Sequence, residues 1–287
     1  MLGLDRTLSP DTPFLHFSVR GLKSVMHRHT CYELVYAHRG SIPVWVAGRE
    51  ETLPEGSFAL LLPGMLHSYD AAEDSVADLW LWRPELLPDL GMLIADRQPL
   101  HAVFSLPEAD AVALLKGLTD AEAAPSLCVP ERPRKKSHRR APVTLPADLL
   151  ALRGTLYSAL AQYFRGMPMV QKSSQLLLLE EVVAYVEEGY KYPISMTLLA
   201  DKIGYERHYL SRFFRASVHM HFTTYVDSYR IEEAMDLLRR TGLPMATVAR
   251  HCGFGSVRTF DRVFLQLVGQ TPSAFKEAAK KQPPTAD

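Results

Sequence analysis

The stretch Leu199–Tyr205 (LADKIGY) returns 49 residues later as Val248–Phe254 (VARHCGF). Each copy precedes a short amphipathic segment with a basic residue and aromatic residues, first Leu210–Phe214 (LSRFF) and then Phe260–Phe264 (FDRVF). In both copies an apolar residue and an alanine open a helical pattern. A glycine follows where that helix must end, because a residue without Cβ accepts the left-handed conformation there. Two short helices joined by a tight turn that contains glycine are typical of a helix-turn-helix, whose second helix enters the major groove of DNA.

The segment between the two copies predicts one longer helix, roughly from Phe222 to Arg240. Its apolar residues recur mostly at helical spacing. Arg239 and Arg240 suit the negative end of the helix dipole, and Gly242 with Pro244 stops the helix. One helix that bridges two helix-turn-helix units would set them about one turn of DNA apart, roughly 34 Å.

The region from about Ser195 to Lys276 resembles the AraC/XylS family of bacterial transcription regulators. The resemblance rests on the double repeat, on the run Tyr229–Ala234 (YRIEEA) and on the terminal run Gly269–Lys276 (GQTPSAFK). A double repeat with that tail is more specific than an isolated helix-turn-helix match. The resemblance implies an all-α C-terminal domain that reads two successive segments of the major groove.

The repeat and the resemblance place a first recognition helix at about Arg207–Ala216 and a second one near Val257. The side chains predicted to face DNA are Arg207, His208, Ser211, Arg212, Val257, Arg258, Thr259, Asp261 and Arg262. We expect Arg207, His208 and Arg258 to contact bases. Arg212 and Arg262 occupy matching repeat positions and would contact either a base or a phosphate, since an arginine can do both.

Two positions depart from the usual pattern of the family. Glu206 stands where a small polar helix cap is usual; a carboxylate suits the positive end of the helix but brings negative charge near DNA. His219 stands where a glycine normally follows the recognition helix, and a positive φ there is uncommon for histidine. We therefore expect the first helix-turn-helix to bind DNA differently from the second, or more weakly.

The formal net charge of the 287-residue chain is zero, but the charges are unevenly distributed. Residues 1–124 hold 9 lysines and arginines against 17 aspartates and glutamates, whereas residues 192–281 hold 13 against 8. The acidic part is a poor surface for nucleic acid, and the basic part is a plausible one. The length allows two domains with separate cores.

The three cysteines, Cys31, Cys128 and Cys252, lie far apart and match no paired metal-binding spacing. An odd number of scattered cysteines favours a reducing compartment. The start of the chain has no apolar core of signal-peptide length, and no apolar run of 18 residues occurs. We expect a cytoplasmic protein that does not engage a membrane.

Short apolar or alternating runs dominate the region from Phe14 to about Leu81 and are separated by turns rich in glycine, proline or charge. The clearest runs are residues 32–36, 42–46, 58–62 and 79–82. Strands this short and closely spaced predict a small β-barrel or jelly roll.

Two patterns in this region resemble cupin motifs. Residues 21–40 contain G-x5-H-x-H-x3-E-x6-G, which fits the first motif at every spacing, and residues 63–67 read P-G-x2-H, which fits part of the second. The asparagine that would complete the second motif is replaced by Ala71. The resemblance implies a cupin-like barrel, which AraC/XylS regulators commonly carry as their effector-binding domain, here residues 1–124.

His27, His29 and Glu33 would share one face of a strand, because side chains alternate along it, and in a cupin that face is the interior. His67 would arrive from a neighbouring strand. Three imidazoles and a carboxylate are a ligand set for a divalent transition metal. The alternative, which we favour from the sequence, is that these residues line a pocket without metal and that the protein needs no cofactor.

Trp45 and Trp80 add large flat apolar surfaces to the same domain. Each could stack on a sugar or an aromatic effector, whereas tryptophan in a β-domain more often belongs to the core or to an interface. The predicted effector pocket comprises His27, His29, Glu33, Trp45, His67 and Trp80.

Residues 125–146 are rich in proline and contain a cluster of six basic residues between positions 132 and 140. This composition predicts a mobile linker, either solvated or in contact with phosphates. A leucine stripe from Leu149 to Leu160 predicts a helix within residues 147–172, which either pairs two subunits or packs on the barrel. The DNA-binding domain would span residues 173–282.

The leading hypothesis is an α+β two-domain transcription regulator: a cupin-like barrel that senses a small molecule, a sugar being one candidate, and an all-α double helix-turn-helix. Its expected partners are double-stranded DNA, a second copy of the chain and, for an activator, RNA polymerase. We expect no enzymatic activity. The alternatives are a metal-binding cupin (metal sensor or enzyme) fused to a DNA-binding domain, and a barrel that serves only dimerisation.

Overall fold

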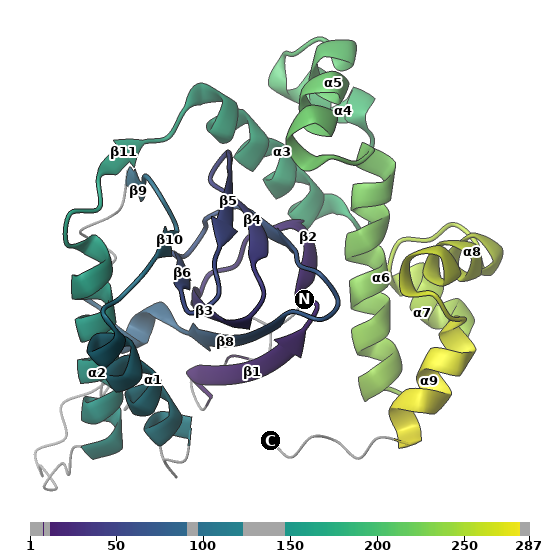
Figure 1. Ribbon diagram of the computed structural model, residues 1–287. Coiled ribbons are helices and arrows are strands. Elements are labelled where there is room, and N and C mark those ends of the chain that lie inside the picture. Colours follow the sequence, from purple (N-terminus) through teal and green to yellow (C-terminus); the bar gives the residue numbers. More distant parts are fainter. Residues whose placement is uncertain (1–7, 9–11, 91–96, 123–146, 282–287) are drawn as a thin grey trace, which may run out of the picture. The chain divides into compact units, whose positions relative to one another are not determined.

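The computed structural model describes residues 8, 12–90, 97–122 and 147–281. The described residues divide into two compact units, one ending at Ser173 and the other beginning at Ser174. The first unit is built around antiparallel β-sheets, and the regular elements described in the second unit are helices (Figure 1). The predicted α+β class, with an N-terminal β-domain and a helical C-terminal domain, is confirmed. The proline-rich basic segment 125–146 lies outside the described residues.

The strands of the first unit form two larger sheets and a two-stranded ribbon. In chain order they are β1 (Phe14–Arg20), β2 (Lys23–His27), β3 (Tyr32–Arg39), β4 (Ile42–Val46), β5 (Arg49–Leu53), β6 (Phe58–Leu61), β7 (His67–Asp70), β8 (Val76–Trp82), β9 (Arg97–Pro99), β10 (Val103–Phe104) and β11 (Met169–Gln171). The five-stranded sheet has the order β1-β8-β3-β6-β10, the four-stranded sheet has the order β2-β7-β4-β5, and β9 pairs with β11.

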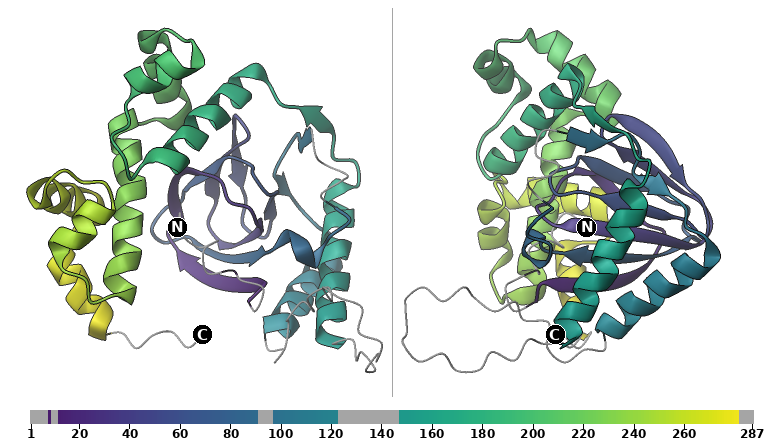
Figure 2. Two further views of the ribbon diagram at one scale, coloured as in Figure 1. Left: turned by 180° about the vertical axis from the view of Figure 1, so that it is seen from behind. Right: turned by 90° about the vertical axis from the view of Figure 1, so that its left-hand side faces the viewer.

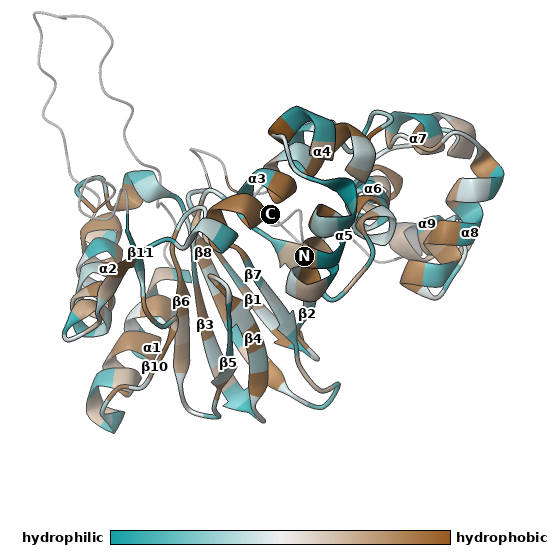
Figure 3. Cartoon of the chain, turned by 90° about the horizontal axis from the view of Figure 1, so that it is seen from above, coloured by the Kyte–Doolittle hydropathy of each residue, from teal (hydrophilic) through white to brown (hydrophobic). Residues whose placement is uncertain are grey.

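The middle of the five-stranded sheet is buried on both faces. Val35 of β3 pairs with Ala59 of β6 and Leu79 of β8, and all three side chains are buried. Leu34, which points to the opposite face, is buried as well. Strands buried on both faces have continuous rather than alternating apolar runs, as the hydrophobic residues along β6 (FALL) show (Figure 3).

Two helices of the first unit, α1 (Glu108–Glu122) and α2 (Ala147–Phe164), pack side by side (Figure 2). Gly117 permits this close approach, because a Cβ at that position would lie 2.5 Å from Oγ1 of Thr155. The leucine stripe of α2, from Leu149 to Leu160, is buried within the unit. The stripe therefore packs inside its own chain, and a subunit contact through α2 would have to use other residues of this helix.

The second unit contains α3 (Ser174–Gly189), α4 (Met196–Ile203), α5 (Arg207–Val218), α6 (Phe222–Arg240), α7 (Met245–His251), α8 (Val257–Val268) and α9 (Pro272–Lys281). The long helix predicted between the two repeats is α6, with the predicted bounds. It contacts α5, α7, α8 and α9 and so connects both repeats. Among the described helices, none combines the length and hydrophobicity that a membrane span requires.

A polar cluster ties α6 to the segment that precedes α4. The buried carboxylate of Glu233 accepts hydrogen bonds from Nζ of Lys191 (2.7 Å) and from the hydroxyl of Tyr190 (3.2 Å). Arg230 donates to the carbonyl oxygens of Tyr190 (2.7 Å) and Tyr192 (3.1 Å). These contacts explain why the run Tyr229–Ala234 contains charged residues although it lies in the middle of a packed helix.

Candidate functional site

The first repeat is a helix-turn-helix made of α4 and α5. Ser195 caps α4 through a hydrogen bond from the N–H of Leu198, and Gly204 ends it with a φ of 75°. The carboxylate of Glu206 accepts hydrogen bonds from the N–H groups of His208 (2.8 Å) and Tyr209 (2.7 Å), which lower its pKa. A glutamate therefore serves here as the helix cap, and it remains negatively charged.

His219 follows α5 with a φ of 57°, so this position does take the left-handed conformation that glycine usually supplies. The corresponding position after α8 is Gly269, with a φ of 78°. The two repeats thus end their recognition helices with the same backbone geometry, although the residue types differ.

The second repeat is a helix-turn-helix made of α7 and α8. Gly253 lies in its turn with a φ of 87°, and Ser256 caps α8 by accepting a hydrogen bond from the N–H of Thr259 (3.1 Å). A Cβ on Gly253 would lie 2.7 Å from the carbonyl oxygen of Lys191, so the turn packs directly on the backbone before α4. The geometry of this turn therefore depends on a residue without a side chain.

The nine side chains predicted to face DNA are exposed in the structure. They are Arg207, His208, Ser211 and Arg212 on α5, and Val257, Arg258, Thr259, Asp261 and Arg262 on α8. The opposite faces hold the helices in place, with Leu210 and Phe214 buried on α5 and Phe260 and Phe264 buried on α8.

Two exposed tyrosines beside the first recognition helix were not among the predicted contacts. Tyr205 is 43% exposed and Tyr209 is 42% exposed, and their rings stack with centroids 5.8 Å apart. The ring of Tyr209 also stacks on that of Phe213, at 6.3 Å. Tyr209 and Phe213 are four residues apart and share one side of α5, and Tyr205 lies four residues earlier in the turn; this aromatic spacing is the signal that could have found them.

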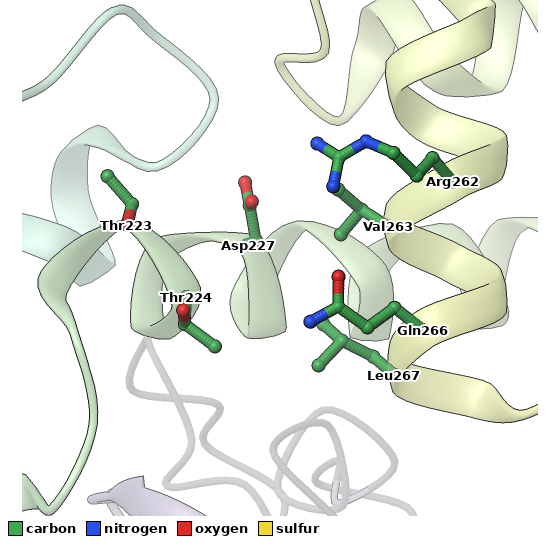
Figure 4. A pocket seen from close by; sticks show the side chains of 7 residues that line it. All are labelled: Thr223, Thr224, Asp227, Arg262, Val263, Gln266 and Leu267. Carbon is green, nitrogen blue, oxygen red and sulfur yellow. The ribbon is translucent and has the colours of Figure 1, made fainter.

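A pocket of about 250 Å³ lies between α6 and α8. Its lining residues are Thr223, Thr224, Asp227, Arg262, Val263, Gln266 and Leu267 (Figure 4). The side chain of Arg262 extends toward Asp227 in Figure 4. Burial raises the pKa of Asp227, and the positive charges of Arg230 and Arg262 partly oppose that rise. The carboxylate of Asp227 forms an ion pair with Arg230 on the same helix, with Nη1 3.3 Å from Oδ1, and it shares the pocket lining with Arg262.

A second candidate site lies inside the first unit, where four polar residues are buried among the strands. His27 ends β2, His67 begins β7 directly opposite it, and Glu33 lies on β3 of the other sheet. His29 lies in the connection between β2 and β3. The prediction that alternation along one strand brings His27, His29 and Glu33 together was wrong in its geometry, because the chain leaves β2 at His27 and starts β3 at Tyr32. The four residues nevertheless converge.

Backbone carbonyls fix the orientation of the three imidazoles. Nδ1 of His27 donates to the carbonyl oxygen of Val25, Nδ1 of His67 donates to that of Met65, and Nδ1 of His29 donates to that of Cys31, each at 2.9 Å. Burial lowers the pKa of His67 to about 4 and the pKa of His27 well below its ordinary value. Both rings are therefore neutral, with the lone pair on Nε2.

Glu33 receives hydrogen bonds from two sides. Nε2 of His29 lies 3.0 Å from its Oε2, and the hydroxyl of Tyr69 donates to its Oε1 at 2.5 Å. Burial alone would raise the pKa of Glu33, but the hydrogen bond from His29, the positive charge of that ring and the hydrogen bond from Tyr69 lower it to about 2. Burial also opposes protonation of His29, yet its hydrogen bonds to Cys31 and Glu33 raise its pKa well above the ordinary value. His29 and Glu33 thus form a buried ion pair.

The structure does not bring the two predicted pocket tryptophans to this cluster. Residues paired across strands share a face of the sheet. Trp80 pairs with Leu34 rather than with Glu33, and Trp45 pairs with Ser68 rather than with His67, so both indoles lie on the faces opposite the cluster. The ring of Trp80 stacks on that of His16, and its N–H donates to Glu122 at the end of α1.

Three of the buried residues, His27, His29 and His67, have ligand atoms within 4.8 Å of one another. Glu33 adds a carboxylate beside them, with Oε2 3.0 Å from Nε2 of His29 and Oε1 3.9 Å from Nε2 of His67.

In a comparison with known proteins, each of the two units matches a protein family. Residues 17–118 match the family described as AraC-like ligand binding domain, and residues 199–278 match the family described as helix-turn-helix domain. SoxS of Escherichia coli is 31% identical over 99 residues, which cover 34% of this chain and 92% of SoxS. YfiF of Bacillus subtilis, an uncharacterised transcriptional regulator, is 25% identical over 279 residues, which cover 92% of this chain and 82% of YfiF.

The fold of the chain also resembles a solved structure along most of its length. The apo form of a ToxT variant from Vibrio cholerae superposes with a TM-score of 0.50 at 13% identity, covering 93% of this chain and 97% of ToxT. The two exposed recognition helices, the buried polar cluster in a β-domain and these comparisons agree. The chain belongs to the AraC family of DNA-binding transcription regulators and carries an N-terminal ligand-binding domain.

Proposed function

We propose that this regulator reads two successive major-groove segments of its operator, one with α5 and one with α8. The observation that carries the proposal is that both helices pack on the same long helix, α6, while each exposes a row of polar and basic side chains. A bridging helix fixes the separation of the two rows, so the two helices act as one reading unit.

Within this surface, Arg207, His208 and Arg258 are proposed to contact bases. An exposed arginine near the start of a recognition helix reaches the guanine edge in a bidentate manner. Arg212 is proposed to contact either a base or a phosphate. Arg262, at the matching position of the second repeat, is likewise proposed to contact either a base or a phosphate.

The N-terminal unit is proposed to sense a small molecule, with a sugar as one candidate, and to control DNA binding without catalysing a reaction. We propose a homodimer that contacts RNA polymerase if it activates transcription. In support of a subunit contact, α2 keeps Leu150 and Tyr157 exposed although its leucine stripe is buried. An effector changes DNA affinity only if it binds one arrangement of the protein better than the other.

The test starts with selection of DNA fragments by the purified full chain, followed by fluorescence anisotropy on the selected sequence at several salt concentrations. We expect Arg258→Ala to cost about 1–3 kcal/mol of binding free energy and to relax the preference at one base pair. A phosphate-contacting arginine would instead weaken all sequences equally and reduce the salt slope by about one.

Arg165→Ala is the matched control, because Arg165 is an exposed arginine of the first unit outside the proposed surface. The DNA affinity and the base preference of Arg165→Ala should equal those of the unmodified chain. Unchanged binding by variants at both Arg258 and Arg262 would refute the proposed surface.

A further inference from the structure

We propose that the first unit binds one divalent first-row transition-metal ion through His27, His29, Glu33 and His67. The proposal concerns the β-domain alone and does not depend on which residues contact DNA. It rests on the convergence of the donors, on the orientation of the rings and on one buried nitrogen that lacks a partner.

The three imidazoles converge from separate segments of the chain. The ring centroid of His67 lies 4.3 Å from that of His27 and 4.9 Å from that of His29. Because the ligand atoms all lie within 4.8 Å of one another, an ion at their centre would be within about 2.8 Å of each. Closure by less than about 1 Å would give the 2.0–2.1 Å of a metal–imidazole bond.

The hydrogen bonds of the three rings are those of metal-ligating histidines. Ligating imidazoles almost always donate their other N–H to a carbonyl or a carboxylate, which fixes the tautomer and the ring orientation. Here each Nδ1 donates to a backbone carbonyl at 2.9 Å, at Val25, Cys31 and Met65. The second nitrogen of His27 and that of His67 are thereby left for a ligand, whereas that of His29 lies 3.0 Å from Oε2 of Glu33.

One of these second nitrogens has no hydrogen-bond partner in the described part of the chain. Nε2 of His67 is buried, the residue is 0% exposed, and its nearest charged neighbour, Oε1 of Glu33, is 3.9 Å away. A buried polar atom without a partner is destabilising, and native proteins rarely leave one. A metal ion between His67 and Glu33 would satisfy this atom.

Glu33 supplies the fourth donor and the negative charge. Its Oε1 accepts a hydrogen bond from the hydroxyl of Tyr69 at 2.5 Å, and its Oε2 lies 3.0 Å from Nε2 of His29. Binding of an ion by His29 would release the hydrogen on this Nε2, because an imidazole must be deprotonated there to bind a metal.

The donor set selects the class of ion. Three imidazole nitrogens and one carboxylate suit divalent zinc, iron, nickel or cobalt, whereas calcium and magnesium prefer sites made of oxygen donors. All four residues are at most 7% exposed, so the ion would be enclosed by the two sheets.

The test uses the full chain with any histidine tag removed, stripped of metal by a chelator and then titrated with Zn²⁺ under calorimetric detection, with metal content measured by mass spectrometry. We expect one equivalent of Zn²⁺ per chain. His67→Gln and His27→Gln should each weaken binding at least tenfold, since each removes a ligand but keeps a polar side chain. Tyr69→Phe should weaken binding about 10–100-fold, the usual effect of losing a residue that orients a ligand.

His16→Gln is the matched control, because His16 belongs to the same unit but stacks on Trp80 on the opposite face of the sheet. It should bind Zn²⁺ like the unmodified chain. Thermal unfolding of each variant checks its folding, and Zn²⁺ should raise the melting temperature of the unmodified chain and of His16→Gln more than that of the three ligand-site variants.

If the substitutions at His27 and His67 prevent folding, X-ray absorption of the zinc-loaded unmodified chain decides the matter by detecting imidazole ligands. Three outcomes would overturn the proposal: less than about a tenth of an equivalent bound by folded protein, full binding by both glutamine variants, or a spectrum without imidazole ligands. None of these outcomes bears on the proposed DNA surface, because fluorescence anisotropy measures DNA binding in a separate experiment.

Discussion

Gly253 shows how a single hydrogen in place of a side chain fixes the second helix-turn-helix. Its φ is 87°, and a Cβ there would lie 2.7 Å from the carbonyl oxygen of Lys191. A left-handed conformation costs a residue with a Cβ about 1–2 kcal/mol, and overlap with rigid backbone adds to that. We expect Gly253→Ala to lower the free energy of opening of α7 and α8 by about 2–4 kcal/mol, measured by amide hydrogen exchange.

Gly269→Ala separates the two contributions. Gly269 has a φ of 78°, but a Cβ there would meet no atom within 4 Å. The Gly269→Ala substitution should therefore lower the stability only by the cost of the left-handed backbone conformation, about 1–2 kcal/mol. Equal losses for the two variants would show that the contact with Lys191 does not matter.

Individual residues of the buried cluster could be named from the sequence, but their arrangement could not. His27, His29, Glu33 and His67 stand at motif spacings, and the structure gathers them. Spacing does not reveal that the chain turns between His27 and Tyr32, nor that Trp45 and Trp80 point away from the cluster. The face on which a side chain lies depends on strand bounds and pairing register, and one residue of error reverses it.

At the scale of elements, Arg230 connects α6 to the segment before α4. It donates to the carbonyl oxygens of Tyr190 and Tyr192, and its guanidinium lies 5.7 Å from the ring centroid of Phe254. Charge-assisted hydrogen bonds contribute about 1.5–3 kcal/mol when their loss leaves buried partners unsatisfied. We expect Arg230→Ala to destabilise the helical unit by about 2–4 kcal/mol in amide hydrogen exchange of α6 and α7.

Arg230→Lys is the informative comparison. An ammonium keeps the charge but cannot donate to both carbonyls with the geometry of a guanidinium. It should recover less than half of the lost stability. Full recovery would indicate that charge alone matters at this position.

The helices of the second unit were more predictable than the strands of the first. Gly242 and Pro244 end α6 where the sequence indicates, because stop signals act locally. By contrast, β5 (Arg49–Leu53) and β7 (His67–Asp70) are mostly polar and exist because neighbouring strands pair with them. Tertiary pairing of this kind leaves little trace in a short segment.

For the whole molecule, the division into a β-domain and a helical DNA-binding domain followed from repeats, charge and turn spacing. The dimer contact did not, because the leucine stripe of α2 serves packing within the chain as well as it would serve a partner. An apolar helical face predicts burial and does not identify what covers it.

The central claim is that both repeats read DNA as one unit, and hydroxyl-radical footprinting of the full chain on its selected operator tests it most directly. We predict two protected segments per subunit, about one helical turn or roughly 10 base pairs apart. Arg212→Ala should weaken only the segment read by α5, and Arg262→Ala only the segment read by α8. A single protected segment that disappears equally with either substitution would contradict the account.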